Sequence, residues 1–446
     1  MFKLLLILPI FLMVSCSKKY LEPPTKAVSN VPAVTLTQQY TSVDYARLSF
    51  KFSSEVNMVN IIRSEIELPR SLYDGKNHFG GFHPGQHSFL DESNLMVDKN
   101  YYYTFFYTRF DEENVNKPGI SVKIKTLNYQ DGMHQLLLEL IEYAKSKSNA
   151  LEFAVGTTHL DVFYDQFDNG EKALKGELMN EIDAVFLFEY QFSKNQHAQM
   201  DNIKNANDWM LDELKSEKKI FAIDYLTLTS PLINEVSPVD GVVHFIDPVE
   251  ESKLFDVEVL NNIPNNDPEL SVNVISEVQN FALYDGSYAL DEPEILTIQG
   301  SSYDLIVLPV SKNSYTSELS PWSLQKITSL KEKSNGINRL VYAMIDVSKV
   351  WENGPFWNMD WNSNPELEPD WVDIGVSKTI ADNSRIEGHD KDHYVKYWRK
   401  DWKSNMKQLI DNVVNSGFDG IVFSGAETYK DYDCKDENGP KICQQP

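Results

Sequence analysis

The chain has 446 residues, of which 42% are hydrophobic, and its formal net charge at pH 7 is −25. This length is typical of two or three domains, and the apolar content is sufficient for buried cores. The acidic balance argues against nucleic acid as a partner, because phosphates are bound by Lys and Arg. A neutral or cationic ligand suits such a chain better.

The amino terminus has the pattern of an export signal. Lys3 precedes an apolar run from Leu4 to Val14, and Ser15 and Cys16 follow. The run is too short to span a bilayer, and a cysteine after a small residue resembles the lipobox of bacterial lipoproteins. We therefore expect a signal peptide at 1–15, a lipid on Cys16 and a tether at 16–30. The protein would be exported and anchored to the cell envelope, at the outer membrane, facing the periplasm or the surface. An ordinary secretory signal with an incidental cysteine is the alternative.

The other two cysteines, Cys434 and Cys443, lie close together near the end of the chain. In an exported protein this spacing predicts a local disulfide. A zinc site is not expected, because no histidine cluster accompanies them. The Gly- and His-rich segment 80–87, which contains His83 and His87, is interpreted as a loop, and a metal site is the alternative. Phosphate-binding and dinucleotide glycine motifs are absent from the sequence, so we predict no metal and no cofactor.

Residues 31–127 predict an all-β domain. Residues 45–52 and 101–108 alternate apolar and polar positions with period two, as half-buried strands do, and residues 120–127 close the segment. The stretch from Leu95 to the final Lys-Thr-Leu resembles a fibronectin type III sandwich. Another small β-sandwich is the alternative.

Residues 128–433 predict an α/β domain. An amphipathic helix is expected at 135–147, and short apolar runs follow it at 151–156, 183–189, 219–224, 241–246, 278–284, 303–308, 339–345 and 419–424. Such runs suit parallel strands that are buried on both faces. Eight strands alternating with helices indicate a (β/α)8 TIM barrel, with residues 434–446 as a tail.

The later runs carry a family resemblance. Five segments carry it: residues 303–308, 340–345 and 370–373, the Tyr-Val-Lys-Tyr-Trp-Arg-Lys-Asp-Trp element at 394–402, and the Gly-Phe-Asp-Gly element at 417–424. Together they resemble glycoside hydrolase family 114. This resemblance implies a (β/α)8 barrel similar to endo-α-1,4-polygalactosaminidases.

The family's elements stand in a different order here. In the family the Gly-Phe-Asp-Gly strand lies midway through the barrel, whereas this chain nearly ends there. Residues 182–189 and 220–225 resemble the family's later strands but come earlier. We therefore expect a circular permutation in which 276–433 supplies the family's first four strands, 128–248 its last four, and 249–275 the link. Strand 419–424 should then pair in parallel with strand 151–156. Two unrelated α/β segments are the alternative.

Glycoside hydrolysis normally needs two carboxyl groups, and barrel enzymes carry such groups past the carboxyl ends of strands. Glu189 ends its strand, matches the family's glutamate and is flanked by Phe188 and Tyr190, which makes it a candidate general acid. A solvated or hydrogen-bonded glutamate at a strand end is the alternative.

The second carboxylate departs from the family pattern. Ser424 stands where the family has aspartate, the family's Gly-Glu-Ala-Glu-Asp reads Asp346-Val-Ser-Lys-Val, and Pro309 replaces an aspartate. Family catalysis is therefore in doubt. The acidic residues at strand ends that could substitute are Asp346, Asp224, Glu427 and Asp285, and spacing does not choose among them.

Aromatic residues supply candidate sugar contacts. Trp351, Trp357 and Trp361 lie in a Gly-, Pro- and Asn-rich loop after a strand, whereas Trp398 and Trp402 have the helical spacing of packing residues. Tyr190, Ser424 and Asp285 complete the set of predicted substrate-binding positions, together with Trp351 and Trp357.

Three functional hypotheses follow. The first is an exported lipoprotein glycosidase acting on an amino-sugar polysaccharide. The second is a catalytically inactive barrel that binds glycan, and the third is a scaffold lipoprotein. The expected partners are a polysaccharide and, through the lipid on Cys16, the membrane. A carboxylate roughly 5–10 Å from Glu189 would favour the first hypothesis.

Overall fold

The computed structural model describes residues 34–75, 77–82, 88–92, 95–110, 116–166, 172–193, 201–227, 230–236, 238–247, 270–284, 292–312, 319–352, 354–362, 364, 367–373, 392–433, 435–436 and 439–440. Four predicted site positions lie outside these residues, namely Cys16, Cys434, Cys443 and Asp285, and so do His83 and His87 of the Gly- and His-rich segment. The chain divides into two compact units, residues 1–126 and 127–446. Within the described ranges, no helix combines the length and apolar character needed to cross a membrane.

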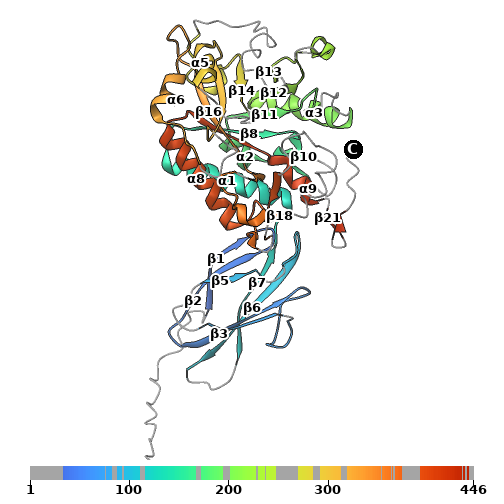
Figure 1. The fold of residues 1–446 in the computed structure, drawn as a ribbon. Coiled ribbons are helices and arrows are strands. Elements are labelled where there is room, and N and C mark those ends of the chain that lie inside the picture. Colours follow the sequence, from blue (N-terminus) through green and yellow to red (C-terminus); the bar gives the residue numbers. More distant parts are fainter. Residues whose placement is uncertain are drawn as a thin grey trace, which may run out of the picture. The chain divides into compact units, whose positions relative to one another are not determined.

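The first unit is a β-sandwich of two antiparallel sheets (Figure 1). One sheet joins β1 (Val34–Thr41), β2 (Ala46–Phe52) and β5 (Ser88–Asp91). The other joins β4 (Asn77–Phe82), β3 (Val56–Ser64), β6 (Asn100–Arg109) and β7 (Lys117–Lys125). Apolar side chains of both sheets, among them Phe50, Ile61 and Phe105, form the buried core. The all-β prediction is therefore confirmed.

Three polar contacts stabilise this sandwich. The backbone N–H of Met96 donates to the hydroxyl of buried Tyr101 at 2.6 Å, near the start of β6. This contact is a tyrosine corner, a recurring feature of immunoglobulin-like sandwiches. Between the sheets, Arg63 Nη1 lies 2.8 Å from Asp91 Oδ2, and the Tyr103 hydroxyl donates to the same oxygen at 2.7 Å.

The Gly- and His-rich segment begins as a strand, so the loop prediction was wrong for its first part. Gly80 and Gly81 belong to β4, which pairs with β3. A Cβ on Gly80 would lie 2.8 Å from Asn60 Oδ1, and that oxygen accepts from Gly81 N at 3.3 Å. The close approach to Asn60 explains why glycine occupies a strand here.

The second unit holds an eight-stranded parallel sheet in the order β13-β12-β11-β8-β20-β16-β15-β14. The bounds of its strands are β8 Glu152–Thr157, β11 Ala184–Phe188, β12 Lys219–Tyr225, β13 Val242–Asp247, β14 Phe281–Leu283, β15 Leu305–Pro309, β16 Leu340–Asp346 and β20 Gly420–Ser424. The two outer strands, β13 and β14, contact each other, so the barrel is nearly closed. Strand β20 pairs in parallel with β8, which confirms the predicted pairing of two segments far apart in sequence.

Helices surround this barrel (Figure 1). They are α1 Tyr129–Lys147, α2 Gly176–Glu181, α3 Asp201–Glu217, α5 Glu292–Gly300, α6 Leu324–Leu330, α8 Lys400–Ser416 and α9 Tyr429–Asp433. Helix α1 begins earlier than predicted, because Asn128 caps it by accepting from Asp131 N at 2.7 Å. It packs against α8. Trp398 and Trp402 are buried, which confirms them as packing residues, but only Trp402 lies in α8, which begins at Lys400.

Short elements complete the second unit. They are the 3-10 helices at 160–163, 231–235, 275–277, 359–362 and 426–428, and the strands β9 Tyr164–Gln166, β10 Lys172–Leu174, β17 Lys349–Trp351, β18 Val372–Asp373, β19 Asp392–Val395, β21 Lys435–Asp436 and β22 Gly439–Pro440. Strand β19 pairs with both β17 and β18 in a small antiparallel sheet.

Aspartates tie the strands together at the amino end of the barrel. Three aspartates stand just before a strand: Asp183, Asp304 and Asp419. Each carboxylate accepts a backbone N–H at 2.8–2.9 Å, and the donor lies in the neighbouring strand or shortly before that strand begins. Asp304 also forms a fully buried ion pair of 2.6 Å with Lys333, which donates to Leu270 O at 3.0 Å. Ile275, the last residue of the predicted link 249–275, is also bound at the amino end of the barrel, because its N–H donates to the Glu152 carboxylate.

Candidate functional site

A carboxylate is fixed at the opposite end of the barrel, where β16 stops. Asp346 is the last residue of β16 and lies opposite Ser424 in the parallel register. Its Oδ1 accepts from the backbone N–H of Ser348 at 2.8 Å and from the Ser348 hydroxyl at 2.7 Å. Both donors come from the tight turn after the strand, so they hold the carboxylate beside the end of β20.

A second carboxyl group approaches it from the turn after β20. Glu427 lies in the 3-10 helix η6 (Ala426–Thr428), directly after Gly425, whose φ is 82°. A Cβ on Gly425 would lie 2.3 Å from Ser348 Oγ and 2.8 Å from Asp346 Oδ1. Glycine therefore allows the turn to pack closely against Asp346.

Glu427 has the properties of a proton donor. Its Oε2 is buried and has no hydrogen-bond partner. Burial raises the pKa of Glu427 to about 7, and the nearby Asp346 carboxylate adds to the rise. Its own backbone amide, Lys349 and the Thr157 hydroxyl act in the opposite direction and lower the pKa. A carboxyl group that is partly protonated at neutral pH can serve as a general acid.

The small sheet and α9 add further charged groups. Lys349 of β17 places its Nζ 5.1 Å from the centre of the Tyr394 ring of β19, and Tyr394 hydrogen-bonds Asp431 of α9. Burial raises the pKa of Asp431, whereas Lys349 lowers it. We call Asp346, Glu427, Asp431, Lys349 and Tyr394 the carboxylate cluster.

Glu189 stands at the carboxyl end of β11, two strands from β20. It is half-buried and its φ is 53°, in the left-handed region that favours glycine. Among the described residues only Asp98 shares this property without being glycine. Thr157, at the end of the intervening strand β8, lowers the pKa of Glu427 and so lies beside it. Glu189 and Glu427 therefore follow strands on either side of β8.

Asp224 supports the backbone behind Glu189. It is fully buried at the end of β12, and its Oδ1 accepts from the backbone N–H groups of Gln191 at 2.5 Å and Phe192 at 2.7 Å. Its Oδ2 lies 2.5 Å from His244 Nε2. With both oxygens engaged inside the protein, Asp224 holds the chain and does not present its carboxylate to the barrel opening.

The predicted aromatic contacts fall into two groups. Trp357 is buried, stacked on His393 at 4.5 Å and edge-on to Trp361 at 5.1 Å, so its ring packs inside the protein. Trp351 is half-buried at the end of β17 and stays a candidate for ligand contact. Tyr190 is buried, and its hydroxyl donates to Asp208 at 3.0 Å.

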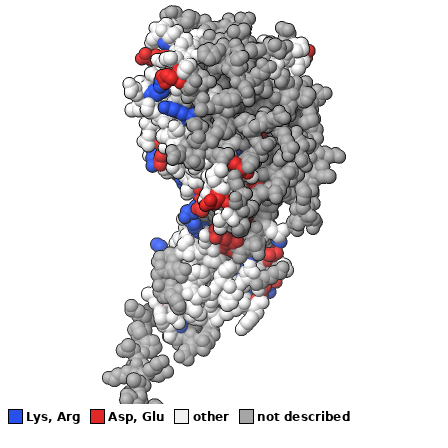
Figure 2. All heavy atoms as spheres, viewed as in Figure 1, with Lys and Arg blue, Asp and Glu red and all other residues white. Residues whose placement is uncertain are grey.

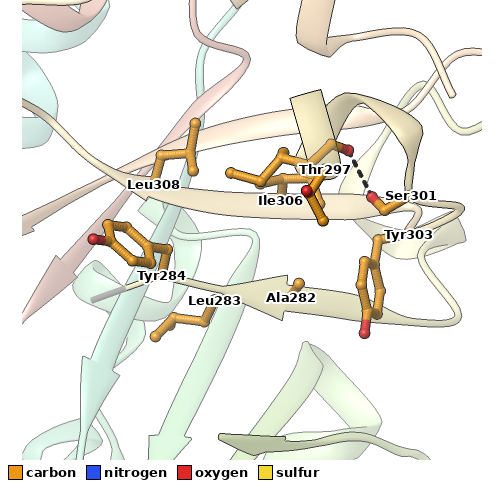
Figure 3. Close-up of a pocket in the computed structure, with 9 residues that line it drawn as sticks. Ala282, Leu283, Tyr284, Thr297, Ser301, Tyr303, Ile306 and Leu308 are labelled. Carbon is orange, nitrogen blue, oxygen red and sulfur yellow. Dashed lines mark hydrogen bonds between the residues drawn. The ribbon is translucent and has the colours of Figure 1, made fainter. Parts of the chain in front are cut away.

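A separate cavity of about 20 Å³ lies between α5 and the strands β14 and β15 (Figure 3). Its walls are largely apolar, with Tyr284 and Tyr303 at opposite ends of the group drawn. None of its lining residues belongs to the carboxylate cluster. A cavity of this size accommodates a water molecule and no sugar.

The sequence analysis missed Thr157, Lys349, Tyr394 and Asp431. Tyr394 opens the Tyr-Val-Lys-Tyr-Trp element, so the family resemblance had marked its segment without giving it a role. Lys349 lies in the Asp346-Val-Ser-Lys-Val segment that was compared with the family, again without a role. Thr157 and Asp431 carry no such signal, because only folding brings their segments to one end of the barrel. Across the described residues, no group of His, Cys, Asp and Glu side chains could hold a metal ion.

The described part of the surface carries charges of both signs. Figure 2 shows Asp and Glu side chains interspersed with Lys and Arg on the described part of this face. Opposite charges also pair directly, as in Lys326–Glu292, at 2.8 Å, and Lys145–Glu181, at 2.5 Å.

Comparison with known proteins yields limited matches. No family model matches the chain. It is 25% identical over 170 residues to an uncharacterized protein of Methanocaldococcus jannaschii, covering 38% of this chain and 43% of that protein. It is 22% identical over 143 residues to an uncharacterized protein of Thermotoga maritima, covering 32% and 38%. The chain thus spans less than half the length of either relative.

Solved structures with partial likeness include a β-1,2-glucanase from Parabacteroides distasonis, at 15% identity over 28% of this chain and 17% of that chain, with a TM-score of 0.18. A fibronectin type III domain of human collagen XX matches at 18% identity over 23% of this chain and 100% of that chain, with a TM-score of 0.15. A family 76 glycoside hydrolase from a bovine Bacteroides thetaiotaomicron strain matches at 9% identity over 26% and 25%, with a TM-score of 0.16. At such TM-scores these likenesses carry no argument about function.

Proposed function

We propose that the barrel is a glycoside hydrolase that cleaves an amino-sugar-containing polysaccharide. The observation that carries this proposal is the pairing of Glu427 with Asp346 at the carboxyl end of the barrel. Glu427 has a buried, unpartnered oxygen and a pKa of about 7, and the Asp346 carboxylate is fixed by two donors. Two carboxyl groups in different environments are what glycoside hydrolysis requires.

In this mechanism Glu427 donates its proton to the glycosidic oxygen of the leaving group. A carboxylate then either activates a water molecule that attacks the anomeric carbon, or attacks that carbon itself to form a glycosyl-enzyme, which water hydrolyses with the deprotonated Glu427 as base. Asp346 and Glu189 both stand at strand ends, and we assign this role to Asp346, because Ser348 orients it and its charge acts on Glu427. Glu189 then contacts the sugar across the end of β8. Ser424, opposite Asp346, replaces the aspartate of the family pattern.

The resemblance to glycoside hydrolase family 114 supports an amino sugar as the substrate unit. The charges of the carboxylate cluster favour the same choice, since Asp346, Glu427 and Asp431 outnumber Lys349 there. Protonated amines on a galactosamine polymer would be attracted to such an acidic opening.

We also propose that the family's barrel is circularly permuted in this chain. The parallel pairing of β20 with β8 supports this order, because it joins the last strand of one sequence block to the first strand of the other. The attachment of residues 270–275 to the amino end of the barrel supports a link between the blocks.

We propose that the protein is exported and held at the cell envelope by a lipid on Cys16. The apolar run before Ser15-Cys16 motivates this proposal. The change Cys16→Ser should move the protein from the membrane fraction to the soluble fraction. Equal membrane association of the variant and wild type would contradict lipid anchoring.

The activity is tested on polygalactosamine with wild type, Glu427→Gln, Asp346→Asn and Glu189→Gln. Loss of a general acid should lower the rate about 10²–10⁴-fold, and we expect comparable losses at Asp346. The matched control is Glu181→Gln, an exposed glutamate of α2 paired with Lys145, which should keep full activity. Full activity of Glu427→Gln would overturn the assignment of the acid.

The second candidate function is a glycan-binding barrel without hydrolysis, favoured by Ser424 at the family's aspartate position. It predicts that wild type binds polygalactosamine without cleaving it. The change Ser424→Asp should then produce cleavage. Cleavage by wild type excludes this candidate.

A further inference from the structure

The backbone turns sharply after β11, at the residues that follow Glu189. Three successive N–H groups are used in this turn. Tyr190 N donates to Ile223 O at 3.2 Å, and the N–H groups of Gln191 and Phe192 both donate to Asp224 Oδ1. The carboxylate of Asp224 therefore occupies the inside of the turn and replaces the backbone acceptors that a regular strand would have offered.

The far end of the turn is fixed by packing and by a further ladder contact. The Phe192 side chain is buried in a small cluster with Leu226 and Ile246. Tyr225 N donates to Phe192 O at 3.3 Å. Residues 189–191 lie between β11 and this buried cluster, so their backbone has little conformational freedom.

His244 orients the carboxylate from the neighbouring strand. It lies in β13, and its Nε2 is 2.5 Å from Asp224 Oδ2, which does not contact the turn. Because Oδ1 accepts two amides and Oδ2 accepts one imidazole N–H, the rotation of the carboxylate is fixed. Hydrogen bonds to an ionised carboxylate are stronger than those between neutral groups.

We propose that Asp224 and His244 are positioning residues that hold Glu189 in its left-handed backbone conformation and so fix its carboxyl group at the barrel opening. The catalytic consequence rests on the proposed function. A glutamate in the left-handed region is strained and returns to an extended conformation unless its surroundings prevent it. The two amides bound by Asp224 belong to the second and third residues after Glu189, so they restrain its backbone.

The test combines hydrogen exchange with kinetics in the full chain. In Asp224→Ala we expect faster exchange of the Gln191 and Phe192 amides and a kcat on polygalactosamine that falls about 10²-fold, the loss typical of a group displaced by about 1 Å. The KM should change less than kcat, because substrate contacts away from Glu189 persist. Asp224→Asn keeps an oxygen for the two amides and should restore most of both properties.

Asp183→Ala is the matched control. Asp183 precedes the same strand β11, and its Oδ2 accepts Phe153 N at 2.8 Å at the opposite end of the barrel. Its loss removes a comparable hydrogen bond but should leave kcat and the exchange of Gln191 and Phe192 unchanged.

The His244 variants test the proposal if Asp224→Ala fails to fold. The change His244→Phe removes only the hydrogen bond that orients Asp224, and should give the faster exchange and the lower kcat to a smaller degree. His244→Gln retains a donor and should restore both properties.

Unchanged exchange at Gln191 and Phe192 in both Asp224→Ala and His244→Phe would overturn the positioning role. A loss of kcat no greater than that in Asp183→Ala would overturn its catalytic consequence. Hydrogen exchange needs no substrate, so it tests the positioning role even if wild type fails to cleave polygalactosamine, an outcome that would count against the proposed function alone.

Discussion

The two ends of the barrel treat their acidic side chains differently. At the amino end, Asp183, Asp304 and Asp419 each accept a backbone N–H, and Asp304 adds a buried ion pair with Lys333. At the carboxyl end, Glu427 keeps a buried oxygen without a hydrogen bond, and Glu189 has a strained backbone.

This contrast separates groups that stabilise the fold from groups that the fold holds at a cost in free energy. Satisfied carboxylates stabilise the folded chain, whereas an unsatisfied or strained group costs free energy and persists where the surrounding structure enforces it. In barrels the carboxyl end is the usual position of working residues and the amino end that of stabilising ones. Removing the buried ion pair at the amino end and removing the unsatisfied carboxyl group of Glu427 at the carboxyl end should therefore have opposite effects on the free energy of unfolding.

The largest effect on stability is expected at the amino end. Lys333→Met leaves the Asp304 carboxylate buried without its partner, and should lower the free energy of unfolding by about 3–5 kcal/mol. Urea denaturation measures this change. Lys326→Met, which breaks the more exposed pair with Glu292, should cost less than about 1 kcal/mol. Equal losses of unfolding free energy in the two variants would contradict the larger contribution expected from the buried pair.

At the carboxyl end, Glu427→Gln should stabilise the protein at alkaline pH. The folded state raises the pKa of Glu427 from 4.5 to about 7, so it binds this proton more tightly than the unfolded chain does. Wild type therefore loses stability as pH rises between these values, by at most about 3 kcal/mol, and the variant avoids this loss.

Denaturation of wild type and Glu427→Gln at pH 5 and pH 8 checks the sign. The difference between them should be small at the acidic pH and large at the alkaline one, and wild-type activity should fall as pH rises through about 7. A pH-independent difference would contradict the raised pKa.

Gly425→Ala should lower stability by about 2 kcal/mol, because its left-handed φ disfavours a Cβ. The added atom would also press on Ser348 and Asp346, so hydrolysis should fall as well. The control Gly176→Ala adds a Cβ where nothing lies within 4 Å. Thermal melts of both variants measure the change, and only Gly425→Ala should lower the melting temperature.

The smallest effect is expected for Glu189→Gly. Relief of the left-handed backbone should raise the free energy of unfolding by up to about 1 kcal/mol, while the loss of the carboxyl group lowers activity. Glu189→Gln lowers activity without that gain. Asp98→Gly relaxes the same backbone conformation in the sandwich, where activity should not respond. A destabilised Glu189→Gly would mean that this conformation carries no strain.

The sequence by itself determined the sandwich, the eight barrel strands and their parallel character. Period-two alternation and continuous apolar runs report burial on one or both faces, which is a local property of each segment. The pairing of residues 419–424 with 151–156 came from the order of family elements. Helix α1 was predicted too short, because the cap at Asn128 lies before the amphipathic repeat.

The roles of the acidic residues were decided only by the tertiary structure. Glu427, Asp346 and Asp224 were equal candidates in the sequence, since each simply follows or ends an apolar run. Folding places Glu427 close to Asp346 and Thr157, and leaves its buried Oε2 without a hydrogen-bond partner. It places Asp224, in contrast, among two backbone amides and His244. Desolvation and hydrogen-bond partners depend on segments distant in the chain, so periodicity and spacing could not distinguish these three carboxyl groups.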